Sequence, residues 1–141
     1  MKPLLLFLIA ALFAGNLGAA TSATGLWVGT YEYPDNAQPP VSFSAVFKSG
    51  KEAESSMATG NSIEVNTFGA PLAPALGGNM IIRIFDDNRV EMVKTYDGKG
   101  DISHSVWYSG KYDPAADSIA GTWYIADGWS ASFTMKRIAG R

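Results

Sequence analysis

Short stretches in which apolar and polar residues alternate follow one another along the chain, separated by turn residues. In residues 41–48, for example, Val41, Phe43, Ala45 and Phe47 alternate with positions that include Ser42 and Ser44. This period of two is typical of β-strands that bury one face. Beyond the first twenty residues, no stretch keeps the helical spacing of apolar residues over three turns. The pattern therefore predicts an all-β protein.

The pattern predicts about nine strands joined by short connections. They are expected at residues 25–33, 41–48, 54–59, 62–68, 80–85, 90–96, 102–112, 119–125 and 129–137. The run at 54–59 is the least regular, and we expect Gly60-Asn61 after it to form a hairpin turn. Residues 70–78 contain two prolines and two glycines, which predicts a loop.

Short connections favour antiparallel neighbours, because a parallel pair needs a crossover of about a dozen residues or more. About eight strands in simple succession close most readily into an up-and-down barrel, and a Greek-key sandwich of the same strands is the alternative. The sequence therefore predicts a single antiparallel up-and-down β-barrel of about eight to nine strands.

The first twenty residues have the pattern of a secretory signal peptide. Lys2 supplies a positive charge, Leu4 to Ala14 form an apolar run, and Gly18-Ala19-Ala20 offers small residues for cleavage. The alternative, an uncleaved membrane anchor, needs about 20 apolar residues. We expect residues 1–20 to be removed and residues 21–141 to form the β-barrel domain. This predicts a periplasmic or secreted protein with no membrane insertion after cleavage.

The composition excludes several kinds of site. The chain has no cysteine and one histidine, which excludes cysteine-based metal sites, sites with two histidines and Cys–His catalytic pairs. Its formal net charge of −2 argues against binding of nucleic acid, because proteins that bind nucleic acid carry clusters of lysine and arginine. We therefore expect no metal, no cofactor and no nucleic-acid partner.

Glycine and aromatic residues recur at alternate positions in several predicted strands. The motifs are Gly25-x-Trp27-x-Gly29-x-Tyr31, Val90-x-Met92-x-Lys94-x-Tyr96, Val106-x-Tyr108-x-Gly110, Ile119-x-Gly121-x-Trp123 and Phe133-x-Met135-x-Arg137. Together they resemble the small lipocalin-like (calycin-like) barrel domains of bacterial exported proteins. This resemblance implies a β-barrel and carries over no catalytic residue. A looser similarity to nitrobindin-like haem-binding barrels is confined to Gly25-x-Trp27-x-Gly29 and Tyr33-Pro34.

The hairpin around residues 97–101 holds the main candidate site. A five-residue loop would pair Tyr96 with Ile102 and place Lys94 opposite His104, with Tyr108 on the same inward face. Because a buried lysine is rare unless it is paired or functional, we interpret Lys94 and His104 as a polar anchor in a ligand cavity. The alternative is that the Lys94 ammonium emerges at the rim while His104 makes one structural hydrogen bond.

Two further features bear on this site. Glu64 is a candidate counter-charge for Lys94, although the alternation does not fix the face on which it lies. A turn at residues 126–128 would set Trp123 against Ala131 and Gly121 against Phe133, alternating large and small residues as barrel interiors need. Trp123, Trp129 and Phe133 are therefore expected in the core, with lining of a pocket as the alternative. The candidate ligand-binding residues are Lys94, Tyr96, His104, Tyr108 and Trp123.

Three functions fit this pattern. The first is a non-enzymatic binding module that accepts a small, partly apolar ligand in the barrel or at its mouth. The second is a protein-interaction module, such as an envelope accessory factor or enzyme inhibitor, acting through the loops at 34–40 and 70–78. The third is a barrel enzyme with Lys94 and His104 as acid–base groups.

Overall fold

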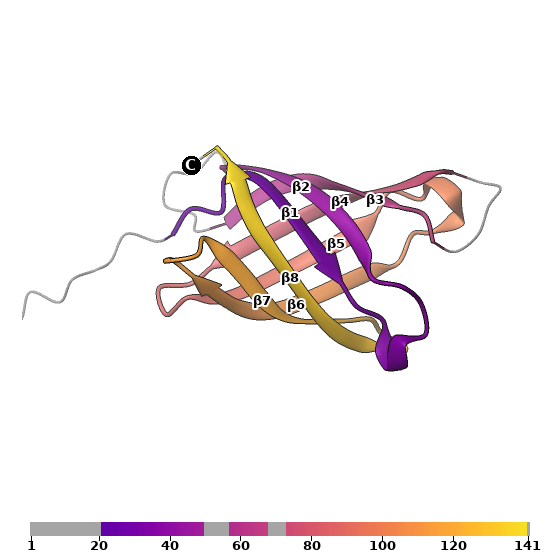
Figure 1. Ribbon diagram of the computed structural model, residues 1–141. Coiled ribbons are helices and arrows are strands. Elements are labelled where there is room, and N and C mark those ends of the chain that lie inside the picture. Colours follow the sequence, from indigo (N-terminus) through magenta and orange to yellow (C-terminus); the bar gives the residue numbers. More distant parts are fainter. Residues whose placement is uncertain (1–20, 50–56, 68–72, 141) are drawn as a thin grey trace, which may run out of the picture.

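The computed structural model describes residues 21–49, 57–67 and 73–140. In this part of the chain, each strand pairs with the next and β1 also pairs with β8, so that the sheet closes into an eight-stranded antiparallel up-and-down barrel (Figure 1). The strands are β1 (Gly25–Tyr31), β2 (Val41–Ser49), β3 (Met57–Val65), β4 (Ala75–Ile84), β5 (Arg89–Tyr96), β6 (Ser105–Asp113), β7 (Ser118–Tyr124) and β8 (Ser130–Ala139). Two short 3-10 helices, η1 (Pro34–Asn36) and η2 (Lys99–Asp101), lie in connections. The predicted fold class is confirmed, and the Greek-key alternative is excluded.

Alternation along the strands sorts the side chains between a packed interior and the outer surface. On β2, Val41, Phe43, Ala45 and Phe47 are all buried, whereas the residues between them are more exposed. The last hairpin has the predicted register, since Gly121 pairs with Phe133 and Trp123 with Ala131. The period of two therefore gave both the strands and the inner face correctly here.

The prediction of two strands around Gly60 was wrong. β3 is one continuous strand from Met57 to Val65, and Gly60 lies in its middle, paired with Phe47 on one side and Met80 on the other. A Cβ atom at Gly60 would lie 1.9 Å from the carbonyl oxygen of Val46. Glycine is needed here because the backbones of β2 and β3 approach closely, not because the chain turns.

Two other boundaries differ from the prediction. β4 begins at Ala75, inside the stretch expected to be a loop, and β6 begins at Ser105 instead of residue 102. The rest of the predicted run at 54–56, part of the loop at 70–78 and the signal peptide at 1–20 lie outside the described residues. No helix in the described part of the chain is long and apolar enough to span a membrane.

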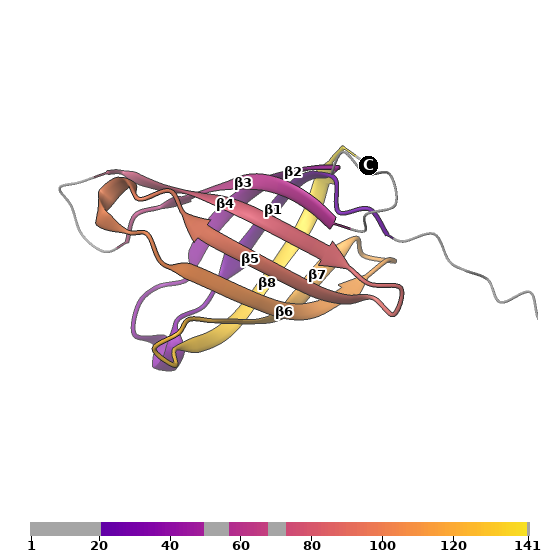
Figure 2. The same cartoon turned by 180° about the vertical axis from the view of Figure 1, so that it is seen from behind.

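One end of the barrel is closed by the segment that precedes β1. The guanidinium of Arg137, a buried residue on β8, donates hydrogen bonds to the carbonyl oxygens of Ser22 (2.8 Å) and Thr24 (2.9 Å) and lies over the ring of Trp27. The indole of Trp27 donates to the carbonyl oxygen of Ala23 at 2.9 Å. Figures 1 and 2 show both 3-10 helices at the opposite end. The closed end and the loops that bound the candidate site therefore lie at opposite ends of the barrel.

Candidate functional site

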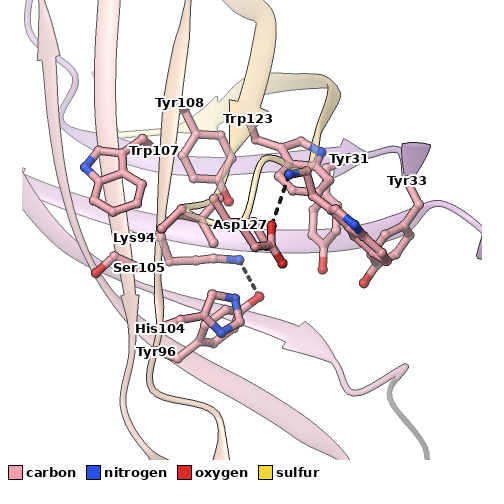
Figure 3. A pocket seen from close by; sticks show the side chains of 14 residues that line it. Tyr31, Tyr33, Lys94, Tyr96, His104, Ser105, Trp107, Tyr108, Trp123 and Asp127 are labelled. Atoms are coloured by element: carbon pink, nitrogen blue, oxygen red, sulfur yellow. Dashed lines mark hydrogen bonds between the residues drawn. The ribbon is translucent and has the colours of Figure 1, made fainter.

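A cavity of about 550 Å³ opens at the end of the barrel where β1, β5 and β7 finish (Figure 3). Its volume lies within the range of about 300 to 1,000 Å³ that is usual for small-molecule sites. Most of its wall is aromatic, from Tyr31, Tyr33, Tyr96, Tyr108, Trp123 and Trp129. Its polar lining includes Lys94, His104, Ser105 and Asp127.

An ion pair lies at the inner end of this cavity. Lys94 points inward from β5, and its Nζ atom lies 2.6 Å from Oε2 of Glu64 on β3. The side chains of Lys94 and Glu64 are only 3% and 1% exposed. The expectation that Lys94 faces the interior is confirmed, and the alternative with its ammonium at the rim is wrong. Glu64 is its counter-charge.

Two tyrosines make further hydrogen bonds to this pair. The hydroxyl of Tyr31 donates to Oε1 of Glu64 at 3.0 Å, and the hydroxyl of Tyr96 donates to the same oxygen. Tyr96 also accepts a hydrogen bond of 3.0 Å from Lys94 Nζ, which lies over the rings of both tyrosines. A buried ion pair is tolerated where such additional bonds satisfy the remaining lone pairs and protons.

Burial and the charge of Glu64 set the protonation of the cluster. Desolvation by burial, and then the negative charge of Glu64, raise the pKa of the Tyr31, Tyr96 and Tyr108 hydroxyls well above their usual value. These hydroxyls therefore stay protonated and can donate. Burial lowers the pKa of the Lys94 ammonium, and the adjacent carboxylate of Glu64 opposes this effect.

The expected pairing of Lys94 with His104 was wrong. Lys94 pairs with Val106, and the backbone amide of Tyr96 donates to the carbonyl oxygen of His104 at 3.2 Å, so the register is shifted by two residues. The cause is a connection that runs from residue 97 to 104 and contains η2, instead of a five-residue loop. His104 is exposed at the mouth, with its ring edge-to-face against Tyr96 at 5.0 Å between centroids.

The five candidate ligand-binding residues nevertheless line the same cavity. Lys94, Tyr96 and Tyr108 are buried around its inner end, as is Trp123, whose indole donates to the carbonyl oxygen of Glu32 at 2.8 Å. His104 lies at the mouth. A shift of two residues keeps every side chain on its original face, because the side-chain period of a strand is two.

Sequence reasoning did not place Tyr31 and Tyr33 at this site. Tyr31, Tyr33 and Trp123 contact one another edge to face, with centroids 5.6 to 6.2 Å apart, and Tyr33 also contacts Trp129. Trp129 is 44% exposed and lines the cavity, so its expected place in the core was wrong and the alternative, lining of a pocket, is confirmed. The motif Tyr31-x-Tyr33, which continues the inward alternation of β1, was the signal that could have found the first two residues.

Phe133 lies in the core as expected and packs edge to face against Tyr108, with centroids 5.0 Å apart. Among the residues that the structure describes, no three His, Cys, Asp or Glu side chains lie close enough together to hold a metal ion. The arrangement is therefore an apolar, aromatic cavity with a hydrogen-bonded ion pair at its inner end.

Comparison with known proteins supports the fold only. No family model matches the chain, and no curated protein matches it. The chain is similar to a redesigned β-barrel, with a TM-score of 0.66 and 15% identity over 86% of this chain and 96% of that chain. It is also similar to a de novo designed fluorescence-activating β-barrel, with a TM-score of 0.55 and 12% identity over 85% of this chain and 97% of that chain. Membership of the lipocalin-like (calycin-like) proteins stays a prediction.

The substitution Glu64→Gln is expected to lower the free energy of unfolding by about 3 to 5 kcal/mol, because it leaves the Lys94 ammonium buried without an anion. Replacing both groups, in Glu64→Leu/Lys94→Met, is expected to recover most of this loss. Urea unfolding of the unmodified protein and of these two variants measures the free energy of unfolding of each. The control is Glu91→Gln, which breaks the exposed Arg89–Glu91 pair and should cost less than about 1 kcal/mol. Equal losses for Glu64→Gln and Glu91→Gln would contradict a buried pair.

The three buried tyrosines are expected to make the protein less stable at alkaline pH. Their pKa values are higher in the folded protein than the value of 10.0 for free tyrosine. Above about pH 10 the unfolded chain loses these protons while the folded protein keeps them, so the free energy of unfolding falls as pH rises. The lowered pKa of Lys94 makes the free energy of unfolding rise with pH, but this is the effect of one group and the three tyrosines act in the opposite direction.

Tyr108→Phe should reduce this dependence by at most about 1.4 kcal/mol per pH unit above pH 10. The measurement is urea unfolding between about pH 8 and pH 11. Tyr124→Phe, which removes a hydroxyl from a residue that is 46% exposed, is the matched control. An unchanged slope in Tyr108→Phe would show that its hydroxyl titrates as in the unfolded chain.

Proposed function

We propose that this protein is an exported, non-enzymatic binding module that accepts a small, partly apolar ligand in the open end of its barrel. The observation that carries the proposal is the cavity of about 550 Å³, whose wall is mainly aromatic and whose polar groups converge at its inner end. Sites of this composition are typical of small-molecule binding. An eight-stranded barrel can hold one such ligand when side chains do not fill it.

The enzymatic alternative is less favoured by the same geometry. Lys94 already donates hydrogen bonds to Glu64 and Tyr96, whereas the His104 side chain is exposed at the mouth of the cavity. An acid–base pair needs both groups within hydrogen-bond reach of one reacting molecule. The arrangement is better suited to holding a ligand than to moving its protons.

Export is part of the proposal, and it rests on the charged start and short apolar run of residues 1–20. When the full chain is expressed in a bacterium with two membranes, the protein should appear in the periplasmic fraction. Its intact mass should be that of residues 21–141. A cytoplasmic protein of full mass would contradict export without affecting the cavity.

Binding inside the cavity predicts that phenylnaphthylamine, a neutral fluorophore, becomes brighter with the protein and that filling the cavity weakens this binding. Val106→Trp adds an indole to a buried position in the lining and should lower the affinity by about tenfold or more, equivalent to about 1.4 kcal/mol. Fluorescence titration measures the affinity. Val46→Trp, on the outer face of β2, is the matched control and should bind as the unmodified protein does.

A thermal unfolding curve checks that each variant is folded. If Val106→Trp does not fold, Ala126→Trp narrows the cavity from its exposed mouth and should have the same effect on binding. Unchanged affinity in a folded cavity variant, or no binding to the unmodified protein, would contradict the proposed function.

A further inference from the structure

The inner end of the cavity holds two hydrogen-bond donors that have no acceptor among the described residues. An ammonium group has three protons, and Lys94 Nζ gives two hydrogen bonds, to Glu64 and Tyr96. The third proton has no hydrogen-bond acceptor among the described residues. Because Lys94 lines the cavity, an atom of a ligand can accept this proton.

The second unused donor is the hydroxyl of Tyr108. This residue is 4% exposed and lines the cavity, and its hydroxyl makes no hydrogen bond within the part of the chain that the structure describes. The edge-to-face contact with Phe133 fixes its ring. Among the described residues, the buried side-chain atoms without a hydrogen-bond partner do not include this hydroxyl, so its oxygen is reached from the cavity and its proton is available to a ligand atom.

The two donors lie on neighbouring strands and on the same face. Lys94 of β5 pairs with Val106 of β6, and Tyr108 is two residues further along β6. Such diagonal neighbours are within reach of long and aromatic side chains. Figure 3 shows both side chains pointing into the cavity from adjacent strands. One acceptor atom can therefore meet both.

The charges of the interior restrict the ligand further. The buried charges at the inner end, those of Lys94 and Glu64, cancel each other. A ligand that brought a net charge to this depth would lose its hydration without gaining a counter-charge. The other charged residue of the lining, Asp127, is exposed at the mouth. The inner end therefore favours an uncharged group that accepts hydrogen bonds.

The shape of the lining supplies the last restriction. Tyr31, Tyr33 and Trp123 form one wall of rings in edge-to-face contact, and Tyr96 lies across the cavity from them in Figure 3. Aromatic walls pack well against flat rings in stacked or edge-to-face geometry. A planar ligand can fill this space, whereas a branched aliphatic one would meet the rings less completely.

Resting on the proposed function, we propose that the ligand is an uncharged, planar aromatic compound with a carbonyl group, whose oxygen accepts hydrogen bonds from Lys94 Nζ and the Tyr108 hydroxyl. Ketones, quinones and lactones carry such an oxygen. The carbonyl enters first, toward the ion pair, and the opposite edge of the ring system lies near Trp129 and His104 at the mouth.

Three naphthalene compounds, substituted at the same ring position, test this inference with the purified mature protein. They are methyl naphthyl ketone, ethylnaphthalene, which lacks the carbonyl, and naphthoate, which carries a charge. Isothermal titration calorimetry gives each affinity. The ketone should bind at least about fivefold more tightly than either of the others, since two hydrogen bonds of ordinary strength contribute about 1 to 3 kcal/mol.

Variants assign the effect to the two donors. Tyr108→Phe should weaken ketone binding by about three- to tenfold, which is the contribution of one hydrogen bond. It should change the affinity for ethylnaphthalene by less than about twofold. Tyr124→Phe on the outer surface is the matched control and should change neither affinity. The infrared carbonyl band of the bound ketone should lie at lower frequency than in an alkane and should move back toward the alkane value in Tyr108→Phe.

The outcomes separate this inference from the proposed function. Equal or tighter binding of ethylnaphthalene or naphthoate, or a carbonyl band at the alkane frequency, would overturn the carbonyl ligand while leaving a ligand-binding cavity in place. If none of the three compounds binds while phenylnaphthylamine still does, the carbonyl ligand is likewise overturned. Failure of phenylnaphthylamine as well would overturn both proposals.

Discussion

Glu64 on β3 and Lys94 on β5 meet inside the barrel across the intervening strand β4, where both side chains are almost fully buried. Neither charge could remain there alone, because the loss of hydration is offset only by the opposite charge and by further hydrogen bonds. A slip of one residue in either β3 or β5 would turn one member of the pair to the outer surface. The pair therefore specifies how three neighbouring strands align. It also brings the hydroxyls of Tyr31 and Tyr96 to one point, which forms the polar inner end of the cavity.

The strand that carries Glu64 explains why sequence reasoning named Glu64 as a candidate counter-charge for Lys94 but did not place it in the interior. On β3 the usual pattern is inverted, since Ile63 and Val65 are 58% and 63% exposed while Glu64 is buried. On this pattern Gly60 is interpreted as a turn residue, although its role is to let β2 and β3 approach closely. Alternation alone assigns apolar residues to the interior, and it fails where a buried charge is satisfied by a partner from a distant part of the chain. The structure shows that Glu64 faces inward and bonds to Lys94, 30 residues away on β5.

Of the two hairpins that were predicted in detail, one has the predicted register and the other does not, and the difference has a physical reason. Between β7 and β8 the turn is short, and Gly128 has a positive φ of 98°, so sequence spacing sets the register correctly. Between β5 and β6 the connection contains η2, and the amide of Asp97 donates to the carbonyl oxygen of Gly77 on β4. Here tertiary contact, and not the loop sequence, sets the register. Because the resulting error was an even number of residues, the inward face was still right, and the candidate residues still gathered in one cavity.

The barrel has one packed end and one open end, and this difference supports a binding role over a purely structural one. At the packed end, Trp27 and Arg137 are buried, and the Arg137 guanidinium bonds to backbone carbonyls of the segment before β1. At the open end, rings of comparable size leave about 550 Å³ between them, and Tyr108 keeps a hydroxyl without a partner in the described residues. If the interior served stability alone, apolar residues such as phenylalanine could fill this space without an unpaired donor. The space left open, and the accessible hydroxyl that faces it, are therefore better explained by a ligand that enters from the mouth and accepts a hydrogen bond there.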